Sequence, residues 1–468
     1  MTYPTGAERR RRYHFSGIAG AGMNPLAQLV RSRGHAVQGS DRSFDQGQNA
    51  PIAARLRALG IEILAHDGSA VRPGIDRVVF STAVEVDTPE MRAARALGLE
   101  LVARPALLAE VVAAGRPGVA IAGTSGKSTV TGMLAWILRT AGVPATVLGG
   151  AALAGEGTAG CFAAGPADAP VVAEACESDG TLVGYRPRLG IVHNVSRDHA
   201  ELDALLEQFG AFARQCGTLL ASAACPEAAA LARAVGGRTY GPAPDADAPL
   251  DVVSSGPHRA RGALRPPRGR LALDVPQPGL HNLDNATAAA LVALEVGVAP
   301  AAIETALRVF PGVSRRFEVI GTTGGGVRVV DDYAHNGAKI RAAVTTAQAG
   351  CARLVAVFQP HGFGPARFLR AELAALLPAL LRPDDRFCYA PVFYAGGTVA
   401  RDVSSRMLAE DLPAHLGCAA PDDHAGVRDW VLRTARPGDT VLVMGARDPE
   451  LPRLARAVFE ALAAAPVA

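Results

Sequence analysis

A glycine-rich segment at residues 123–129 contains the residue types that bind nucleotide phosphates. It reads Gly-Thr-Ser-Gly-Lys-Ser-Thr and lies between an apolar strand-like run and a helical pattern. A strand, a glycine turn and a helix in this order form a phosphate-binding loop. We expect Gly126 to let backbone N–H groups approach phosphates, Lys127 to supply positive charge and Ser128 to offer its hydroxyl to Mg²⁺. The general pattern G-x-x-x-x-G-K-[ST] has glycine where this chain has Ile121, so the loop is a shortened form.

A second glycine cluster follows the first strand-like run of the chain. Its glycines are Gly17, Gly20 and Gly22, and Asp41 ends the next predicted strand. In dinucleotide-binding folds such glycines face a phosphate group, and an acid about 20 residues further on contacts a ribose hydroxyl. Because an ATP-type loop is also present, we expect this unit to bind a nucleotide-linked substrate. The alternative is a tight strand-to-helix turn that binds no ligand.

Further polar side chains follow other apolar runs, where α/β units place their ligand crevices. The groups are Glu174 with Glu177, the segment His193 to His199, and the segment Asp331 to His335. Carboxylate and hydroxyl oxygens suit Mg²⁺, whereas histidine is an unusual ligand for it. His193 is therefore either a ligand or a hydrogen-bonded loop residue. The pair Arg315-Arg316 is either a salt-bridge latch at a domain junction or a finger that reaches the neighbouring site.

Composition excludes several classes of protein. The formal net charge of +3 gives no electrostatic reason to expect a nucleic acid partner, and we interpret the basic cluster Arg9 to Arg12 as a solvated tail. No stretch approaches the roughly 18 uninterrupted apolar residues of a membrane span. The polar N-terminus predicts no signal peptide and no membrane association.

The seven cysteines are scattered, and no pair has C-x-x-C spacing. This distribution supports neither a zinc site nor a disulfide framework. Reduced thiols in a cytoplasmic protein fit it best.

Strand-like and helical patterns alternate along the chain, which predicts an α/β fold with parallel sheets. The 468 residues suggest about three domains at roughly 150 residues each. A proline-rich region at 241–267 predicts a small antiparallel excursion, and residues 285–294 predict an alanine-rich helix. Proline-glycine breaks separate a Rossmann-like N-terminal domain, a P-loop ATPase domain and a Rossmann-like C-terminal domain, at residues 1–115, 116–312 and 313–468.

Six motifs in a fixed order resemble those of the Mur ligases, which are ATP-dependent enzymes that form amide bonds in peptidoglycan synthesis. The motifs are G-T-S-G-K-S-T, E-A-C-E-S-D, N-V-S-R-D-H, H-N-L-D-N-A, R-R-F-E and D-D-Y-A-H. The resemblance covers essentially all of residues 13–460. The opening G-I-A-G-A-G-M with Q-G-S-D is most similar to the members that join L-alanine to UDP-N-acetylmuramate. It is also similar to the members that recycle the murein tripeptide.

The resemblance implies roles for individual positions. The UDP part of the substrate would be held by Gly17, Gly20, Gly22 and Asp41. The ATP site would consist of Gly123, Thr124, Ser125, Gly126, Lys127, Ser128, Thr129, Asn282, Arg316 and Asp332. Within that site, Asn282 would contact the adenine, Asp332 the ribose and Arg316 the γ-phosphate.

The metal ligands and catalytic residues are implied in the same way. Mg²⁺ would be held by Ser128, Glu177 and His199. The catalytic residues would be Lys127, His199, Arg316 and His335. The implied cofactors are ATP and Mg²⁺, and the implied substrates are a UDP-linked sugar carboxylate and an amino acid. The protein is expected to be a monomer or a homodimer.

The implied reaction has two steps. A substrate carboxylate attacks the γ-phosphate of ATP and forms an acyl phosphate. An amine then attacks that acyl phosphate, and phosphate leaves from a tetrahedral intermediate. Because this chemistry brings anions together, cations of the kind that Lys127 and Arg316 supply are required.

Several positions depart from the common pattern of these ligases, mainly where substrate and amine should meet. The departures include Ser125, Ser196, Asn336, Gly337 and Gly362. They leave two alternatives open. The chain could be a paralogue that acts on another acyl acceptor, in muropeptide recycling or in making a small natural product. It could also be a nucleotide-binding protein without ligase activity.

Overall fold

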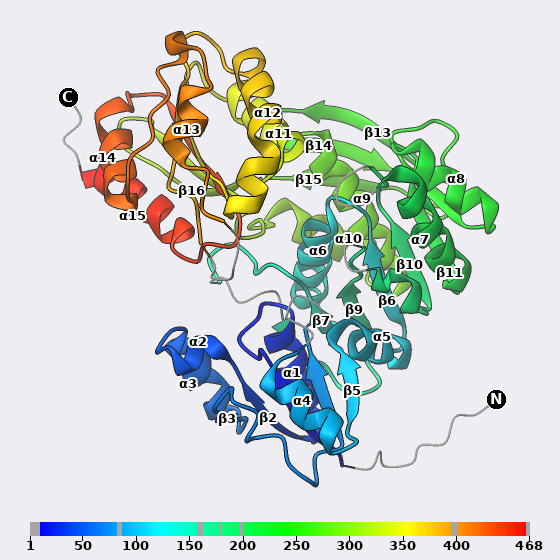
Figure 1. Cartoon of the computed structure of the whole chain (residues 1–468). Coiled ribbons are helices and arrows are strands. Elements are labelled where there is room, and N and C mark those ends of the chain that lie inside the picture. The colour runs from blue at the N-terminus through cyan, green and yellow to red at the C-terminus, as the bar shows by residue number, and fades with distance from the viewer. Residues whose placement is uncertain are drawn as a thin grey trace.

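The computed structural model describes residues 10–81, 87–156, 162–177, 180–196, 201–394 and 400–464. Within these residues the chain forms three β-sheets flanked by helices, which confirms the predicted α/β class. Figure 1 shows three lobes in chain order, with the central lobe adjoining the other two. No helix in the described part of the chain is long and apolar enough to cross a membrane.

The first sheet is fully parallel, with strand order β3-β2-β1-β4-β5. Its strands are β1 (Arg12–Ser16), β2 (Ala36–Ser40), β3 (Glu62–Leu64), β4 (Arg77–Phe80) and β5 (Glu100–Ala103). Its helices are α1 (Met23–Ser32), α2 (Arg42–Asp45), α3 (Ala50–Ala58), α4 (Pro89–Ala96) and α5 (Arg104–Ala114). The strand order reverses beside β1, and α/β sheets bind ligands at the carboxyl end of such a strand.

The second sheet has ten strands in the order β15-β14-β13-β12-β11-β10-β6-β9-β7-β8. Its parallel part consists of β6 (Gly118–Ala122), β7 (Thr146–Leu148), β9 (Val171–Glu174), β10 (Leu189–Val192), β11 (Thr218–Ser222) and β12 (Arg238–Gly241). Strand β8 (Phe162–Ala163) pairs antiparallel with β7. Strand β13 (Ala248–Ser255) is parallel to β12 and antiparallel to β14 (Ala260–Leu264), which in turn pairs antiparallel with β15 (Leu271–Val275). The predicted antiparallel excursion is therefore confirmed.

Helix α5 also packs against β6 and β9 of this second sheet, and five α-helices and a 3₁₀ helix follow within residues 116–312 of the described chain. They are α6 (Lys127–Thr140), η1 (Thr181–Gly184), α7 (Leu202–Gln215), α8 (Pro226–Ala234), α9 (Leu280–Glu295) and α10 (Pro300–Arg308). Helix α9 includes the predicted alanine-rich helix and begins one turn earlier. Almost every α9 side chain is buried, because α9 packs against α6 on one side and against the sheet on the other.

The third sheet has the order β16-β17-β20-β18-β19, and only its edge strand β16 is antiparallel to its neighbour. The strands are β16 (Glu318–Thr322), β17 (Arg328–Asp332), β18 (Leu354–Gln359), β19 (Arg386–Tyr389) and β20 (Thr440–Gly445). The helices are α11 (Gly337–Ala349), α12 (Phe363–Leu380), α13 (Ser405–Glu410), η2 (Ala414–Leu416), α14 (His424–Thr434) and α15 (Leu451–Ala464).

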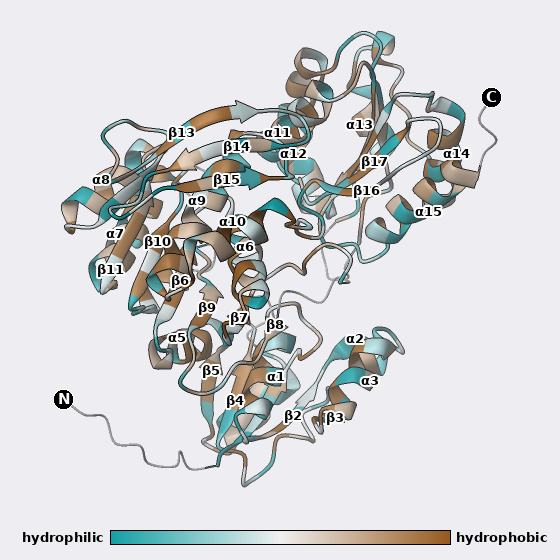
Figure 2. Cartoon of the chain, turned by 180° about the vertical axis from the view of Figure 1, so that it is seen from behind, coloured by the Kyte–Doolittle hydropathy of each residue, from teal (hydrophilic) through white to brown (hydrophobic). Residues whose placement is uncertain are grey.

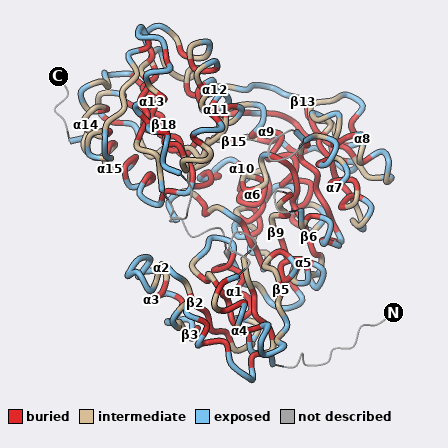
Figure 3. The backbone as a smooth tube through the Cα atoms, viewed as in Figure 1, coloured by how far each residue is buried: buried red, intermediate tan, exposed pale blue. Residues whose placement is uncertain are grey.

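Strand β6 shows how the central core is built. Val119 and Ile121 belong to the apolar cluster on the α6 and α9 side, and Ala120 and Ala122 belong to the cluster on the opposite face. This alternation is that of a strand buried on both faces. Ile121 is completely buried, so the position where general phosphate loops have glycine is here an ordinary core position. Figures 2 and 3 show the same layering, with hydrophobic, buried strands inside more polar helices.

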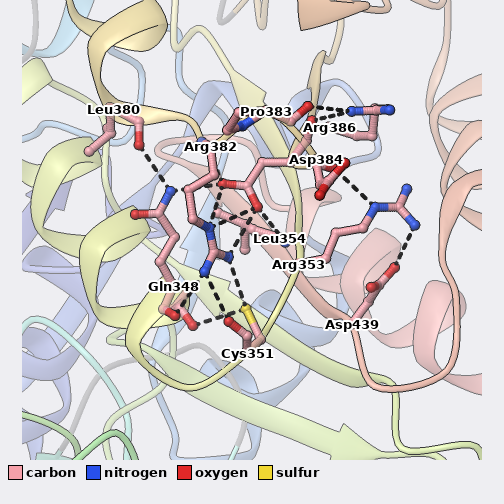
Figure 4. A network of polar contacts seen from close by, with 12 residues as sticks. Gln348, Cys351, Arg353, Leu354, Leu380, Arg382, Pro383, Asp384, Arg386 and Asp439 are labelled. Atoms are coloured by element: carbon pink, nitrogen blue, oxygen red, sulfur yellow. Dashed lines mark hydrogen bonds and ion pairs between the residues drawn. The ribbon is translucent and has the colours of Figure 1, made fainter.

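A polar network closes the amino ends of β18, β19 and β20. Asp385 accepts hydrogen bonds from Leu354 N at 2.8 Å and from Gln348 Nε2 at 2.9 Å, and it pairs with Arg382. Arg353 Nη1 lies 3.3 Å from Asp439 Oδ2 in the same network (Figure 4). Because functional loops of parallel sheets lie at the carboxyl ends of the strands, we interpret this network as structural.

Side chains join the lobes. Arg33 Nη2 donates to Thr146 Oγ1 at 3.2 Å, which connects the first lobe to the second. Arg328 on β17 lies 2.8 Å from His258 Nδ1 on the β13–β14 turn, which connects the third lobe to the second. A bridge between Leu153 and Val313 lies where the chain passes from the second lobe to the third. These contacts connect the first and third lobes to the central lobe.

Gly118 provides a test of the packing around β6. A Cβ atom at this position would lie 1.8 Å from the carbonyl oxygen of Val112, and backbone cannot move aside as a side chain can. Gly118→Ala is therefore expected to destabilise the protein by about 1–3 kcal/mol, measured as a lower midpoint of thermal unfolding. Gly184→Ala is the matched control, because no atom lies within 4 Å of its added Cβ. Equal midpoints for the two variants would contradict this account.

Candidate functional site

The predicted phosphate loop connects β6 to α6 and has the backbone that phosphate binding requires. Gly123 has a φ of 145°, and Gly126, which precedes the first residue of α6, has a φ of 84°. Both values lie in the region that favours glycine. The amino end of α6 therefore presents unpaired N–H groups and the positive end of the helix dipole to the space above the loop.

Two carboxylates engage the loop from β9. Glu177 Oε2 lies 2.7 Å from Lys127 Nζ, and Lys127 also donates to the carbonyl of Gly123. Ser128 Oγ donates to Glu174 Oε2 at 3.1 Å. Ser128 and Glu177 remain predicted ligands of Mg²⁺, and Glu174 is the carboxylate in direct contact with Ser128. The reason is strand register: Glu174 pairs with Ile121, two residues before the loop.

Residues after β10 hold the loop from its other side. Asn194 Oδ1 accepts hydrogen bonds from Thr124 Oγ1 and from Ser125 N, both at 2.8 Å. Ser196 Oγ lies 2.8 Å from the same Thr124 hydroxyl. Sequence reasoning assigned no role to Asn194, although its place just after a strand that pairs with β6 was a usable signal. The predicted metal ligand His199 lies outside the described residues.

Arg316 brings a positive charge from the third lobe to the loop. Its Nη2 atom lies 3.4 Å from Ser128 Oγ. The guanidinium groups of Arg316 and Arg315 both lie against the ring of Tyr333, at 4.9 and 5.0 Å from its centroid. This contact between a cation and an aromatic face orients Arg316 towards the loop.

The segment that carries Arg316 is conformationally strained. Arg315 and Phe317 have φ values of 60° and 52°, which side chains other than glycine rarely adopt. Asp332 stabilises the turn, because it accepts hydrogen bonds from Phe317 N and Ala334 N, both at 2.7 Å. Strain of this kind is typical of functional segments held by their surroundings.

The acids of this turn are unusual in their protonation. Burial raises the pKa of Asp332, and it raises the pKa of Asp331 to about 7, although Arg315 opposes the shift. Asp331 Oδ2 lies 3.3 Å from Arg315 Nε. Both acids thus hold the Arg315–Phe317 turn, and a contact between Asp332 and a ribose remains a prediction.

Two further predicted residues occupy different surroundings. Asn282 accepts a hydrogen bond at 3.1 Å from Asn285, whose Oδ1 would lie 2.6 Å from a Cβ at Gly126, so Asn282 is linked to the loop. His335 lies at the carboxyl end of β17, where its ring meets His361 edge-on at 5.1 Å. Burial lowers the pKa of His361 to about 4, and the nearby charges of Arg447 and Lys339 add to this.

The first-lobe residues form a separate group at the carboxyl end of β1. Gly17 N donates to Ser40 O at 2.8 Å, and Asp41 Oδ2 accepts from Ala19 N at 2.9 Å, so the acid ties the glycine turn to the end of β2. A Cβ atom at Gly22 would lie 3.2 Å from Arg104 Cδ, which places an additional cation beside the turn. This arrangement has the chemistry of an anion site.

Comparisons with known proteins agree with this architecture. Three family models match in order: the Mur ligase catalytic domain at residues 12–116, the Mur ligase middle domain at 121–293 and the Mur ligase glutamate ligase domain at 315–447.

Named relatives match over most of the chain. A UDP-N-acetylmuramate–L-alanine ligase of Arthrobacter is 39% identical over 88% of this chain and 88% of its own length. One of Renibacterium salmoninarum is 37% identical over 97% and 96%. The structure of the UDP-N-acetylmuramate–alanine ligase of Thermotoga maritima matches with a TM-score of 0.75 and 25% identity over 96% of this chain and 98% of that one. The chain therefore belongs to the Mur ligase family of ATP-dependent ligases.

Proposed function

We propose that the chain joins L-alanine to the carboxylate of UDP-N-acetylmuramate, with hydrolysis of ATP to ADP and phosphate. The relatives that are 35–39% identical to this chain carry that name, and they match over most of its length. The observation that carries the proposal is that Arg316 of the third lobe contacts Ser128, the residue next to Lys127 on the loop of the central lobe. A ligase that activates a carboxylate needs this convergence of positive charge.

The donor set beside the loop fits Mg²⁺. Ser128 Oγ and Glu174 Oε2 are oxygen atoms 3.1 Å apart, and the Glu177 carboxylate forms an ion pair with the neighbouring Lys127. Mg²⁺ in nucleotide sites takes one or two carboxylates and completes its shell with phosphates and water. We propose Ser128 and Glu177 as ligands, with Glu174 as a further oxygen donor and His199 for a second ion. When bound, the ion would neutralise charge on the transferred phosphoryl group.

In the proposed mechanism, the loop N–H groups and Lys127 hold the ATP phosphates in line with the substrate carboxylate. Arg316 neutralises charge that develops as the γ-phosphoryl group passes to that carboxylate. The amino group of the second substrate then attacks the acyl phosphate, and phosphate leaves. Closure of the third lobe over the loop excludes water, which would otherwise hydrolyse the acyl phosphate.

In this proposal each of the three lobes binds a different substrate. Residues 1–115 would bind the UDP group through Gly17, Gly20, Gly22 and Asp41. Residues 116–312 would bind ATP, with Asn282 at the adenine, and residues 313–468 would bind the amino acid near His335. Each of the three sheets lies within one of these segments, which supports the boundaries.

The residues near the proposed amine-binding site give a reason to test other amine substrates. Asn336 caps α11 by accepting a hydrogen bond from Lys339 N at 3.0 Å. A Cβ atom at Gly337 would lie 1.9 Å from Glu372 Oε1, so this glycine admits a carboxylate from α12 close to the helix end. A negative charge at this place would influence which amine binds. The substrate test therefore includes an amino-acid panel and a murein tripeptide.

The purified protein is expected to release phosphate from ATP only when Mg²⁺, UDP-N-acetylmuramate and L-alanine are all present. Lys127→Ala should reduce this rate by about 100-fold or more, because the loop loses its charge. Arg139→Ala, at an exposed position near the other end of α6, is the matched control. Phosphate release is measured together with the mass of the product. Activity with the tripeptide or another amino acid, but not with L-alanine, would sink the substrate assignment.

Asn194→Ala is expected to raise the KM for ATP by roughly tenfold with a smaller effect on kcat, because Thr124 and Ser125 lose their shared acceptor. Ser196→Ala removes only one contact to Thr124 and should have the smaller effect. Initial rates at varied ATP concentration give both constants. An unchanged KM in Asn194→Ala would show that the loop does not depend on this support.

A further inference from the structure

A buried polar cluster lies directly beneath the phosphate loop, and the mechanism above does not use it. Its central residue is His193, which follows β10 and is 5% exposed. A Cβ atom at Gly126 would lie 2.7 Å from His193 Cδ2 and 3.2 Å from its Nε2. The imidazole thus lies against Gly126, which immediately precedes α6, and a side chain at this position would collide with it.

Residues from three other elements surround His193. Tyr240 on β12 places its hydroxyl 2.8 Å from His193 Nδ1, and Asp284 on α9 places Oδ2 3.7 Å from His193 Nε2. Ser222 on β11 donates to the same Asp284 oxygen at 2.7 Å. The other oxygen of Asp284 is buried with no hydrogen-bond partner in the described residues.

Burial shifts the pKa values of the ionisable members of the cluster. Burial lowers the pKa of His193 to about 4 and raises the pKa of Asp284 to about 7. Burial also raises the pKa of Tyr240, so its hydroxyl keeps its proton and can donate it to Nδ1 of a neutral imidazole. The ring proton then lies on Nε2, which faces Asp284. Near neutral pH, Asp284 is therefore the member that changes charge.

Other ionisable groups near the cluster are few in the described residues. Lys127, the first residue of α6, pairs with Glu177. His281, on the first turn of α9, has its pKa lowered by burial and by the nearby His193. Cys225 acts on Tyr240. None of them lies between the imidazole and the loop, where Gly126 makes the contact.

We propose that His193 and Asp284 form a positioning pair for the phosphate loop, and that binding of the ATP polyphosphate is coupled to uptake of a proton by this pair. The proposal rests on the binding of ATP at residues 123–129. The negative phosphates of a nucleotide bound above Gly126 would repel an ionised Asp284 carboxylate beneath the loop. Bound nucleotide therefore favours the protonated form of Asp284. By linkage, nucleotide affinity must then fall as Asp284 ionises.

The sign of the pH effect follows from the raised pKa. Below about pH 7 Asp284 already holds its proton, and nucleotide binding requires no change in charge. As the pH rises through that value, binding must draw a proton from solution. Affinity for a non-hydrolysable ATP analogue is expected to fall roughly threefold to tenfold between about pH 6.5 and about pH 8.5.

The test is calorimetric titration of the full chain with this analogue and Mg²⁺, in two buffers of different ionisation enthalpy. The wild type is expected to take up a large fraction of a proton on binding near pH 7.5, and Asp284→Asn is expected to take up much less. Asp439→Asn is the matched control, because burial also raises the pKa of Asp439. Asp439 lies in the third lobe, immediately before the first residue of β20. The proton uptake of this variant should equal that of the wild type.

Two more variants separate positioning from simple loss of folding. Ser222→Ala removes the hydrogen bond that lowers the pKa of Asp284, so the uptake profile should move to higher pH without loss of binding. His193→Gln should raise the KM for ATP more than it lowers kcat, because Gly126 loses its support. Nucleotide binding with equal proton uptake in wild type and Asp284→Asn would overturn this proposal alone. Absence of nucleotide binding by the wild type would overturn it together with the proposed function.

Discussion

In the proposed reaction, cations from separate lobes must converge on one glycine-rich loop. Lys127 is fixed by its place at the start of α6, whereas Arg316 must reach Ser128 from a different sheet, at 3.4 Å. Mutual repulsion of the phosphates and a substrate carboxylate would otherwise oppose their approach. In Figure 1 the third lobe, which carries Arg316, adjoins the central lobe, which contains α6.

The Arg315–Phe317 turn, which positions Arg316, has a strained backbone. Its two positive φ values are held by buried acids and by an aromatic ring, and each of these groups lies on or just after β17. A rigid sheet therefore determines where Arg316 points. The same logic applies beneath the loop, where β10, β11 and β12 place His193, Ser222 and Tyr240 around one carboxylate of α9. Parallel strands are suited to this task because their carboxyl ends align along one edge.

Local features were predictable from the sequence because their causes are local. The glycine loop, the βαβ alternation and the antiparallel excursion each arise from residues adjacent in the chain. Strand β16 has no regular alternation in sequence, because a bulge lies between Val319 and Gly321. Helix α9 begins earlier than predicted, because the polar residues His281, Asn282 and Asp284 interrupt the apolar pattern that would mark its start.

The resemblance to the family, the glycine-rich loop and the cationic residue types could all be recognised in the order of residues within short segments. The sequence could not decide between Glu174 and Glu177 as the partner of Ser128, since that depends on the register of β9 against β6. It also left His193 open as a ligand or a loop residue. Only the tertiary structure placed that imidazole under Gly126 with Asp284 beside it, because α9 and β10 are distant in the chain and meet only when the central sheet is packed.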